Sequence, residues 1–393
     1  MQPTRNRRRG ITLVEVLMST MVVMLGILGL ISLIPLGSHL AERGTRSDRV
    51  ASIGRRVQRE AKVYGMMNPD SWLDPLKSPT PVDQTRFRTS ASSLPVRQSY
   101  LIDPMFFIDS ATQRQFFPYD TTATPQMRRL SLGSYNASFP FMESRAERAF
   151  VSDDDYGVGT AGGYERPKDR EEPLLQKFFT RGGTNIRRQS QGTYSWAIML
   201  VPEASSTRVN TSTGGNMPPF ATAAAGSTTG NSQPPTDQYV MSTIIFQNRQ
   251  GDIPTSADIA GATERGLLNE RVLTVETGSF ISGGGTTGEI QLTAGTPELL
   301  DMKTGDWICL TVRVTRTIGS NMYYWGDNFK WYRVVAMDEI EEVTVGSKYD
   351  LRLTLDGPDW NAMDPPTQAI YVEDVVGVYE RKVRLETGSP WTP

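Results

Sequence analysis

The stretch that organises this chain runs from Arg7 to Leu36 and reads RRRGITLVEVLMSTMVVMLGILGLISLIPL. Basic residues come first, a glycine follows them, and a long apolar segment follows the glycine. Glu15 is the only charged residue of that segment. A helix of about 20 apolar residues can cross the hydrocarbon layer of a membrane, and residues 11–36 exceed that length. The sequence therefore predicts a transmembrane helix at 11–36.

The basic residues in front of the apolar segment predict its orientation. Arg7, Arg8 and Arg9 immediately precede it, and positively charged flanks tend to stay in the cytoplasm. We therefore expect a single pass through the inner (cytoplasmic) membrane, with the segment in contact with membrane lipid. The N-terminus would lie in the cytoplasm and the body would be extracytoplasmic.

Three explanations of this segment compete. A secretory signal peptide has an apolar core of about 7–15 residues and a small-residue cleavage site, but here the run is longer and no Ala-x-Ala pattern follows. A plain signal anchor explains everything except Glu15. An ionised carboxylate inside a membrane costs on the order of 2.5–3.5 kcal/mol and calls for a functional partner.

The third explanation is a resemblance. The run Gly10-Ile11-Thr12-Leu13-Val14-Glu15-Val16-Leu17 resembles the prepilin-type leader of type IV pilins and pseudopilins, whose pattern is Gly-Phe-Thr-Leu-Ile-Glu. The chain departs from that pattern at Ile11 and Val14, and both residues are still apolar. The stretch from Leu25 to Leu30 is also similar to minor pilins of the V type. The resemblance ends at about residue 65 and leaves the large body unassigned.

The resemblance implies a structural function. A prepilin peptidase/methyltransferase would cut after Gly10 and methylate Ile11, and Glu15 of one subunit would pair with the new amine of the next. Two buried charges that pair are far less costly than either alone. The chain would then be a minor pilin of a type IV pilus or a pseudopilin of a type II secretion system, with other pilin-like subunits as partners and a surface filament as its destination. The sequence does not separate these two.

Composition limits the other functions. The net charge of −2 gives no electrostatic reason to expect nucleic acid. With one histidine, His39, and one cysteine, Cys309, most hydrolytic triads and histidine metal sites cannot be built. We therefore expect no catalytic residue, no metal and no cofactor. An anchored hydrolase with carboxylate or Ser-Lys chemistry and an anchored, unassembled binding module remain as alternatives.

The pattern beyond the apolar segment predicts the domain organisation. We expect a leader at 1–10, the transmembrane helix at 11–36, an extramembrane helix at 37–67, a pilin-like body at 68–270 with a low-complexity insertion at 203–237, and a β-rich region at 271–393. The fold class is therefore α+β. A long, partly transmembrane N-terminal helix would pack on a mainly antiparallel β body, and a small C-terminal β-barrel is one form of the last region.

Strand signals are clearest in the second half. From Trp307 to Arg316 apolar side chains alternate with others, so that Ile308 and Leu310 share one face and Cys309 lies on the opposite face. Residues 193–201 and 239–246 read as two strands of one hairpin.

An aromatic cluster is the candidate contact surface of the body. It comprises Tyr323, Tyr324, Trp325 and Trp331. Exposed Tyr and Trp side chains suit subunit packing or a surface ligand such as carbohydrate. A place in the core is the alternative for part of the cluster.

Overall fold

The computed structural model describes residues 12–67, 99–103, 116–119, 123–130, 157–158, 164–165, 179–182, 185–188, 193–202, 238–249, 270–281, 288–318, 321–344, 348–360 and 364–385. Two compact units divide the chain, Met1–Ile53 and Gly54–Pro393. The predicted leader at 1–10 and the predicted insertion at 203–237 lie outside the described residues.

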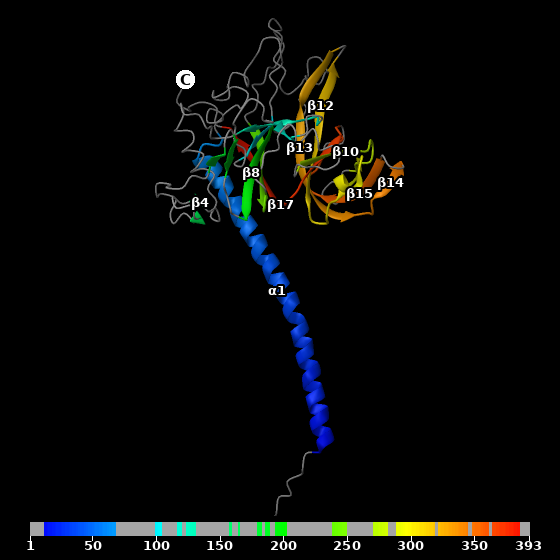
Figure 1. Cartoon of the computed structure of the whole chain (residues 1–393). Coiled ribbons are helices and arrows are strands. Elements are labelled where there is room, and N and C mark those ends of the chain that lie inside the picture. Colours follow the sequence, from blue (N-terminus) through cyan, green and yellow to red (C-terminus); the bar gives the residue numbers. More distant parts are fainter. Residues whose placement is uncertain are drawn as a thin grey trace, which may run out of the picture. The chain divides into compact units, whose positions relative to one another are not determined.

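A single long helix, α1 (Leu13–Val63), dominates the N-terminal part (Figure 1). The hydroxyl oxygen of Thr12 accepts a hydrogen bond from the backbone N–H of Glu15 at 3.4 Å. Thr12 and Glu15 thus stand at the first and last positions of a capping-box pattern, in which a Ser or Thr cap satisfies an otherwise unpaired N–H. The carboxylate also lies in the first turn, where the helix dipole favours negative charge.

The other end of α1 is closed by a glycine. Gly65 has a positive φ of 65°, and its N–H donates to the carbonyl of Lys62 at 3.2 Å. The N–H of Met66 reaches back to the carbonyl of Ala61 at 2.8 Å. This pair of bonds is the Schellman motif, in which glycine adopts the left-handed conformation without steric cost. The helix therefore ends at Val63, a few residues before the predicted limit at 67.

The transmembrane helix predicted at 11–36 is wrong. Within the described part of the chain, no helix is long and apolar enough to cross a membrane. The single-pass location in the inner membrane rested on the predicted span and is corrected with it.

The first sheet of the body has six strands in the order β17-β9-β8-β1-β3-β2. Their bounds are β1 Tyr100–Ile102, β2 Phe116–Phe117, β3 Met127–Leu130, β8 Tyr194–Pro202, β9 Gln238–Gln247 and β17 Val375–Arg384. All neighbours are antiparallel except β1 and β3. The antiparallel pairing of β8 with β9 confirms the hairpin predicted at 193–201 and 239–246.

The second sheet closes on itself. Its strands are β10 Glu270–Val275, β11 Gly288–Ala294, β12 Trp307–Ile318, β13 Asn321–Met337, β14 Glu341–Thr344, β15 Lys348–Asp356 and β16 Gln368–Val372. Their order is β11-β10-β16-β12-β13-β15-β14, and an additional pairing joins β11 to β15. This pairing closes a ring of six strands, and β14 extends it as an outer strand. A 3₁₀ helix, η3 (Pro297–Leu300), follows β11.

Apolar side chains fill the ring and also cover one of its outer faces. Ile308 and Leu310 of β12 belong to the inner cluster, together with Leu273 and Leu353. Cys309, on the opposite face of β12, belongs to a second cluster with residues of β8 and β9. The alternation predicted for 307–316 is thus confirmed for the described side chains, which extend to Val314, and it places the first sheet against the outside of the ring.

The C-terminal strands connect the two sheets. β16 lies in the ring and β17 lies in the first sheet, with only Glu373 and Asp374 between them. Asp374 adopts a positive φ of 64° in this turn. On the other side of β17, the amide of Gln58 in α1 donates to the carbonyl of Tyr379 at 3.5 Å. The end of α1, from Gly54 on, therefore packs on the edge of the first sheet.

Two short hairpins complete the described strands. They are β4 Gly157–Val158 with β5 Tyr164–Glu165, and β6 Phe179–Gly182 with β7 Asn185–Arg188.

The expected α+β class with a partly transmembrane helix on a β body is wrong. The described chain is mainly β, and α1 is its one α-helix.

Candidate functional site

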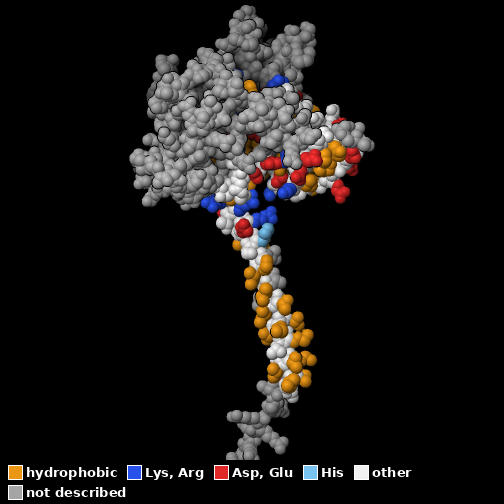
Figure 2. Space-filling model, viewed as in Figure 1, with side chains coloured by type: hydrophobic (Ala, Val, Ile, Leu, Met, Phe, Trp, Pro, Cys, Tyr) orange, Lys and Arg blue, Asp and Glu red, His pale blue; other side chains and the backbone are white. Residues whose placement is uncertain are grey.

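The N-terminal part of α1 presents an uncovered apolar surface, shown as the hydrophobic side chains along the helix in Figure 2. Fifteen large apolar side chains have exposed fractions from 50% to 77%: Leu13, Val14, Val16, Leu17, Met18, Met21, Val22, Val23, Met24, Leu25, Ile27, Leu28, Ile31, Ile34 and Leu40. Several of them are consecutive, so successive positions point to all sides of the helix. From this point the name apolar segment refers only to the run from Leu13 to Leu28, in which every side chain is described.

Polar groups in the apolar segment are satisfied by the helix itself. The hydroxyl of Ser19 donates to the carbonyl of Glu15 at 2.9 Å. The hydroxyl of Thr20 donates to the carbonyl of Leu17 at 2.9 Å. Gly26 has open space where a side chain would stand, which permits close approach of another helix. The segment therefore offers an apolar surface interrupted by one carboxylate, that of Glu15.

An apolar surface of this kind is normally buried against other apolar groups. A helix that is hydrophobic on all sides is normally buried, and large exposed apolar patches mark interaction sites. Complete burial of one such side chain contributes about 1.5–3 kcal/mol. Covering five of them would release on the order of 10 kcal/mol before the cost of association.

The predicted processing residues lie outside the described part of the chain. This applies to Arg7, Arg8, Arg9, Gly10 and Ile11. Glu15 is described, and it is exposed in the first turn of α1, two residues after the helix begins.

The predicted aromatic surface is only partly described. Tyr323, Tyr324 and Trp325 lie in β13, but their side chains are outside the described part. Trp331 is 2% exposed and packs in the cluster between the two sheets. It pairs with Cys309, which places it on the covered outer face of the ring. For Trp331 the predicted contact surface is therefore wrong, and the core alternative holds.

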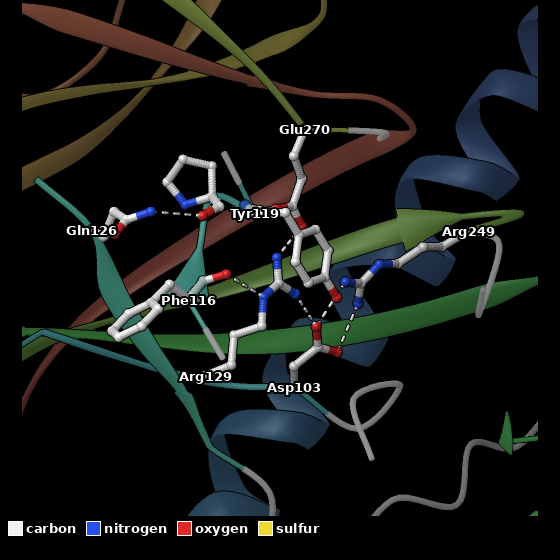
Figure 3. Close-up of polar contacts among 8 residues, drawn as sticks. Asp103, Phe116, Tyr119, Gln126, Arg129, Arg249 and Glu270 are labelled. Carbon is white, nitrogen blue, oxygen red and sulfur yellow. Dashed lines mark hydrogen bonds and ion pairs between the residues drawn. The ribbon is translucent and has the colours of Figure 1, made fainter. Parts of the chain in front are cut away.

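The body also contains a buried group of charges that the sequence did not reveal, and Figure 3 shows it. We call Asp103, Arg129, Arg249 and Glu270 the ionic cluster. Arg129 is fully buried; it donates to Asp103 Oδ2 at 2.7 Å and forms an ion pair with Glu270. Arg249 binds both oxygens of Asp103, at 2.8 and 2.7 Å.

Neutral groups complete the ionic cluster. The Nε of Arg129 donates to the carbonyl of Phe116 at 3.0 Å, and its guanidinium lies 3.8 Å from the centre of the Tyr119 ring. The backbone N–H of Tyr119 donates to Glu270 at 3.2 Å. Two positive and two negative charges thus balance, and aromatic stacking and hydrogen bonds compensate for lost hydration.

The ionic cluster keeps its arginines charged. Burial alone lowers the pKa of Arg129, but the adjacent carboxylates, Glu270 first, outweigh burial and raise it above the ordinary value. Burial also lowers the pKa of Arg249, but the adjacent carboxylate of Asp103 outweighs burial. The pKa of Arg249 is therefore raised as well. Burial raises the pKa of Tyr119 to about 12. At neutral pH the cluster is therefore a permanent set of ion pairs beside a neutral phenol.

The position of the ionic cluster indicates a structural role. Asp103 follows β1, Arg129 belongs to β3 and Arg249 follows β9, all strands of the first sheet. Glu270 begins β10, a strand of the ring. The cluster therefore ties the two sheets together. Its acceptors are occupied by arginines, so it offers no base poised beside a nucleophile.

The single cysteine and the single histidine, the other candidates for catalytic or metal-binding chemistry, do not belong to the ionic cluster. Cys309 is buried, and burial raises the pKa of its thiol well above the ordinary value, which makes it unreactive. His39 is exposed on α1. Among the described residues, no group of three or more His, Cys, Asp or Glu side chains is placed to hold a metal ion.

Comparison with known proteins adds no relative: no family model, no curated protein and no solved structure matches the chain. The geometry of α1 and of the body is therefore the basis for a functional proposal.

Proposed function

We propose that the chain is a structural, pilin-like subunit that assembles with copies of itself and with related subunits through the apolar segment of α1. The observation that carries this proposal is the exposure of apolar side chains on every side of the helix from Leu13 to Leu28. A bundle of such helices would cover these side chains without any contribution from the body. The body would then lie outside the bundle.

Processing would prepare the helix for this assembly. Cleavage after Gly10 by a prepilin-type peptidase would leave Ile11 with a free amine, two residues before α1 begins. In a bundle, Glu15 of one copy would pair with the Ile11 amine of the next. An unpaired charge buried among apolar side chains costs several kcal/mol, whereas a well-placed pair recovers much of that cost. The pair would therefore fix the axial stagger of neighbouring copies.

The N-terminus of the protein isolated from producing cells tests the processing step. Mass spectrometry of the intact chain and of its N-terminal peptide is expected to find Ile11 as the first residue, with one added methyl group. A chain that keeps residues before Ile11, or that is cut elsewhere, would contradict the proposal.

A pair of matched variants tests the role of the carboxylate. Glu15→Gln removes the charge and keeps the shape, so assembly should fall by about tenfold or more, the equivalent of about 1.4 kcal/mol. Glu42→Gln makes the same change farther along α1, outside the apolar segment, and should assemble normally. Sedimentation of filaments measures both. Equal assembly of the two variants would exclude the charge pairing.

A further inference from the structure

The ring of the body carries a second exposed surface with a distinct composition. Residues 335–343 comprise the end of β13, the connection to β14 and most of β14. They are exposed except for Met337, which is half-buried against the core of the ring. We call this run the acidic edge. Val335, Ile340 and Val343 are 43%, 38% and 54% exposed, and four carboxylates stand among them: Asp338, Glu339, Glu341 and Glu342.

The acidic edge is unsuited to pairing with itself. β14 is the last strand in the order of its sheet, so one of its edges pairs with no other described strand. No lysine or arginine occurs between Arg333 and Lys348 in the sequence. Two acidic edges side by side would therefore repel each other, which is a common protection of exposed strands. Exposed apolar residues with charges around them nevertheless mark a contact surface.

The complementary surface occurs on α1. Leu40, Arg43 and Arg46 follow one another at three-residue steps, which places them along one side of the helix. All three are exposed, and Leu40 is 57% exposed. From Arg43 to Lys62 the helix has seven basic and two acidic residues, a net charge of +5. We call Leu40, Arg43 and Arg46 the basic row.

We propose that the acidic edge of one copy docks on the basic row of a second copy. The carboxylates would face Arg43 and Arg46, and Ile340 or Val343 would cover Leu40. The chain as a whole is nearly neutral, at −2, but these two surfaces carry charges of opposite sign. Because they differ, the contact is heterologous, and contacts of this kind generate either closed rings or open helical assemblies. This inference rests on the proposed assembly function.

Charge reversal in separate chains tests the contact. Variant A carries Arg43→Glu and Arg46→Glu, and variant B carries Glu339→Lys and Glu341→Lys. All four residues are exposed, so both variants should fold, with unfolding temperatures close to that of the unmodified chain. The full chains are kept apart in mild detergent, and assembly is started by its removal. Each variant alone brings like charges together, and its critical concentration for assembly should rise by about tenfold or more.

Mixing the two variants decides whether the contact joins different copies. In an equimolar mixture, the introduced glutamates of variant A would meet the introduced lysines of variant B, and the unaltered arginines of B would meet the unaltered carboxylates of A. The mixture is therefore expected to assemble at close to the unmodified concentration. A control with Glu289→Lys and Glu298→Lys, exposed carboxylates of the ring outside the acidic edge, should assemble normally.

Each other outcome overturns the inference. If A and B alone assemble as well as the unmodified chain, the two surfaces do not meet. If the mixture fails but one chain with all four changes assembles, the contact lies within a chain. If the mixture and that chain both fail, the residues act in another way. If the unmodified chain does not assemble, the proposed function itself fails, which distinguishes that result from the other three.

Discussion

The apolar segment of α1 and the body of this chain differ in the burial of their apolar side chains. The body buries its apolar side chains in two clusters, one inside the strand ring and one between the ring and the first sheet. It even holds the ionic cluster, in which each charge is paired with an opposite one. The apolar segment leaves side chains such as Leu13 and Val22 at 77% and 69% exposure. The described part of the body therefore buries most of its apolar side chains within itself, whereas the segment needs other molecules to bury its own.

The largest expected effect is on assembly, from a charge placed in the apolar segment. Leu25→Lys puts an unpaired ammonium among side chains that become buried in a bundle, which costs several kcal/mol. Assembly should therefore fall by about 100-fold or more. Because the body does not depend on this residue, its unfolding temperature should not change. Ala41→Lys adds the same charge to α1 beyond the segment and should assemble within about threefold of the unmodified chain.

The next effect concerns the stability of the body. Arg129→Met removes the central cation of the ionic cluster and leaves Glu270 buried without its ion-pair partner. The free energy of unfolding should fall by about 3–5 kcal/mol in urea titrations. Adding Glu270→Gln should recover part of this loss, because it removes the unpaired charge. Arg128→Met, at the neighbouring and partly exposed position, should cost about 1 kcal/mol or less. Equal losses at the two positions would contradict the role of the cluster.

Two glycines of α1 compare its covered and uncovered parts directly. A methyl group on Gly54 would lie 2.5 Å from the ring of Tyr379, so Gly54→Ala should destabilise the body by about 1–3 kcal/mol. Gly44 has nothing within 4 Å, and Gly44→Ala should be neutral or stabilising by up to about 1 kcal/mol. Urea unfolding followed by circular dichroism measures both. A larger loss at Gly44 than at Gly54 would reverse the comparison.

The last effect is confined to alkaline pH. The pKa of Tyr119 is about 12 in the folded chain and about 10 when unfolded. Between these values the unfolded state has lost the proton and the folded state has kept it, so stability falls as pH rises from 10 to 12. One such group contributes a slope of about 1.36 kcal/mol per pH unit. Tyr119→Phe should reduce the measured slope by about that amount, and an unchanged slope would show that Tyr119 ionises normally.

Local patterns were sufficient to predict β8, β9 and β12. The alternation around Cys309 and the apolar runs that became β8 and β9 depend only on side-chain order along a strand, and the structure confirms them. The long helix was predicted in the same way. Its environment was not predictable, because an apolar run does not determine what covers it. The transmembrane prediction was wrong because no helix in the described part of the chain is long and apolar enough to cross a membrane.

Features that join distant residues were not predictable. Arg129 and Glu270 are 141 residues apart, and neither residue has a neighbour that indicates a buried ion pair. The closure of the ring by β11 and β15 likewise depends on tertiary pairing. For Trp331, an aromatic side chain in a strand suits a core and a contact surface equally well. Only the packing of the ring on the first sheet distinguishes them.

The most direct test identifies what covers the apolar segment. A photo-crosslinking amino acid replaces Val22, which is 69% exposed on the single chain, and the assembled protein contains equal amounts of ¹⁵N-labelled and unlabelled chains. After irradiation and digestion, mass spectrometry should find residue 22 joined to α1 peptides, with labelled and unlabelled peptides linked to each other. Crosslinks to lipid, to an unrelated protein or only within one chain would contradict assembly through α1.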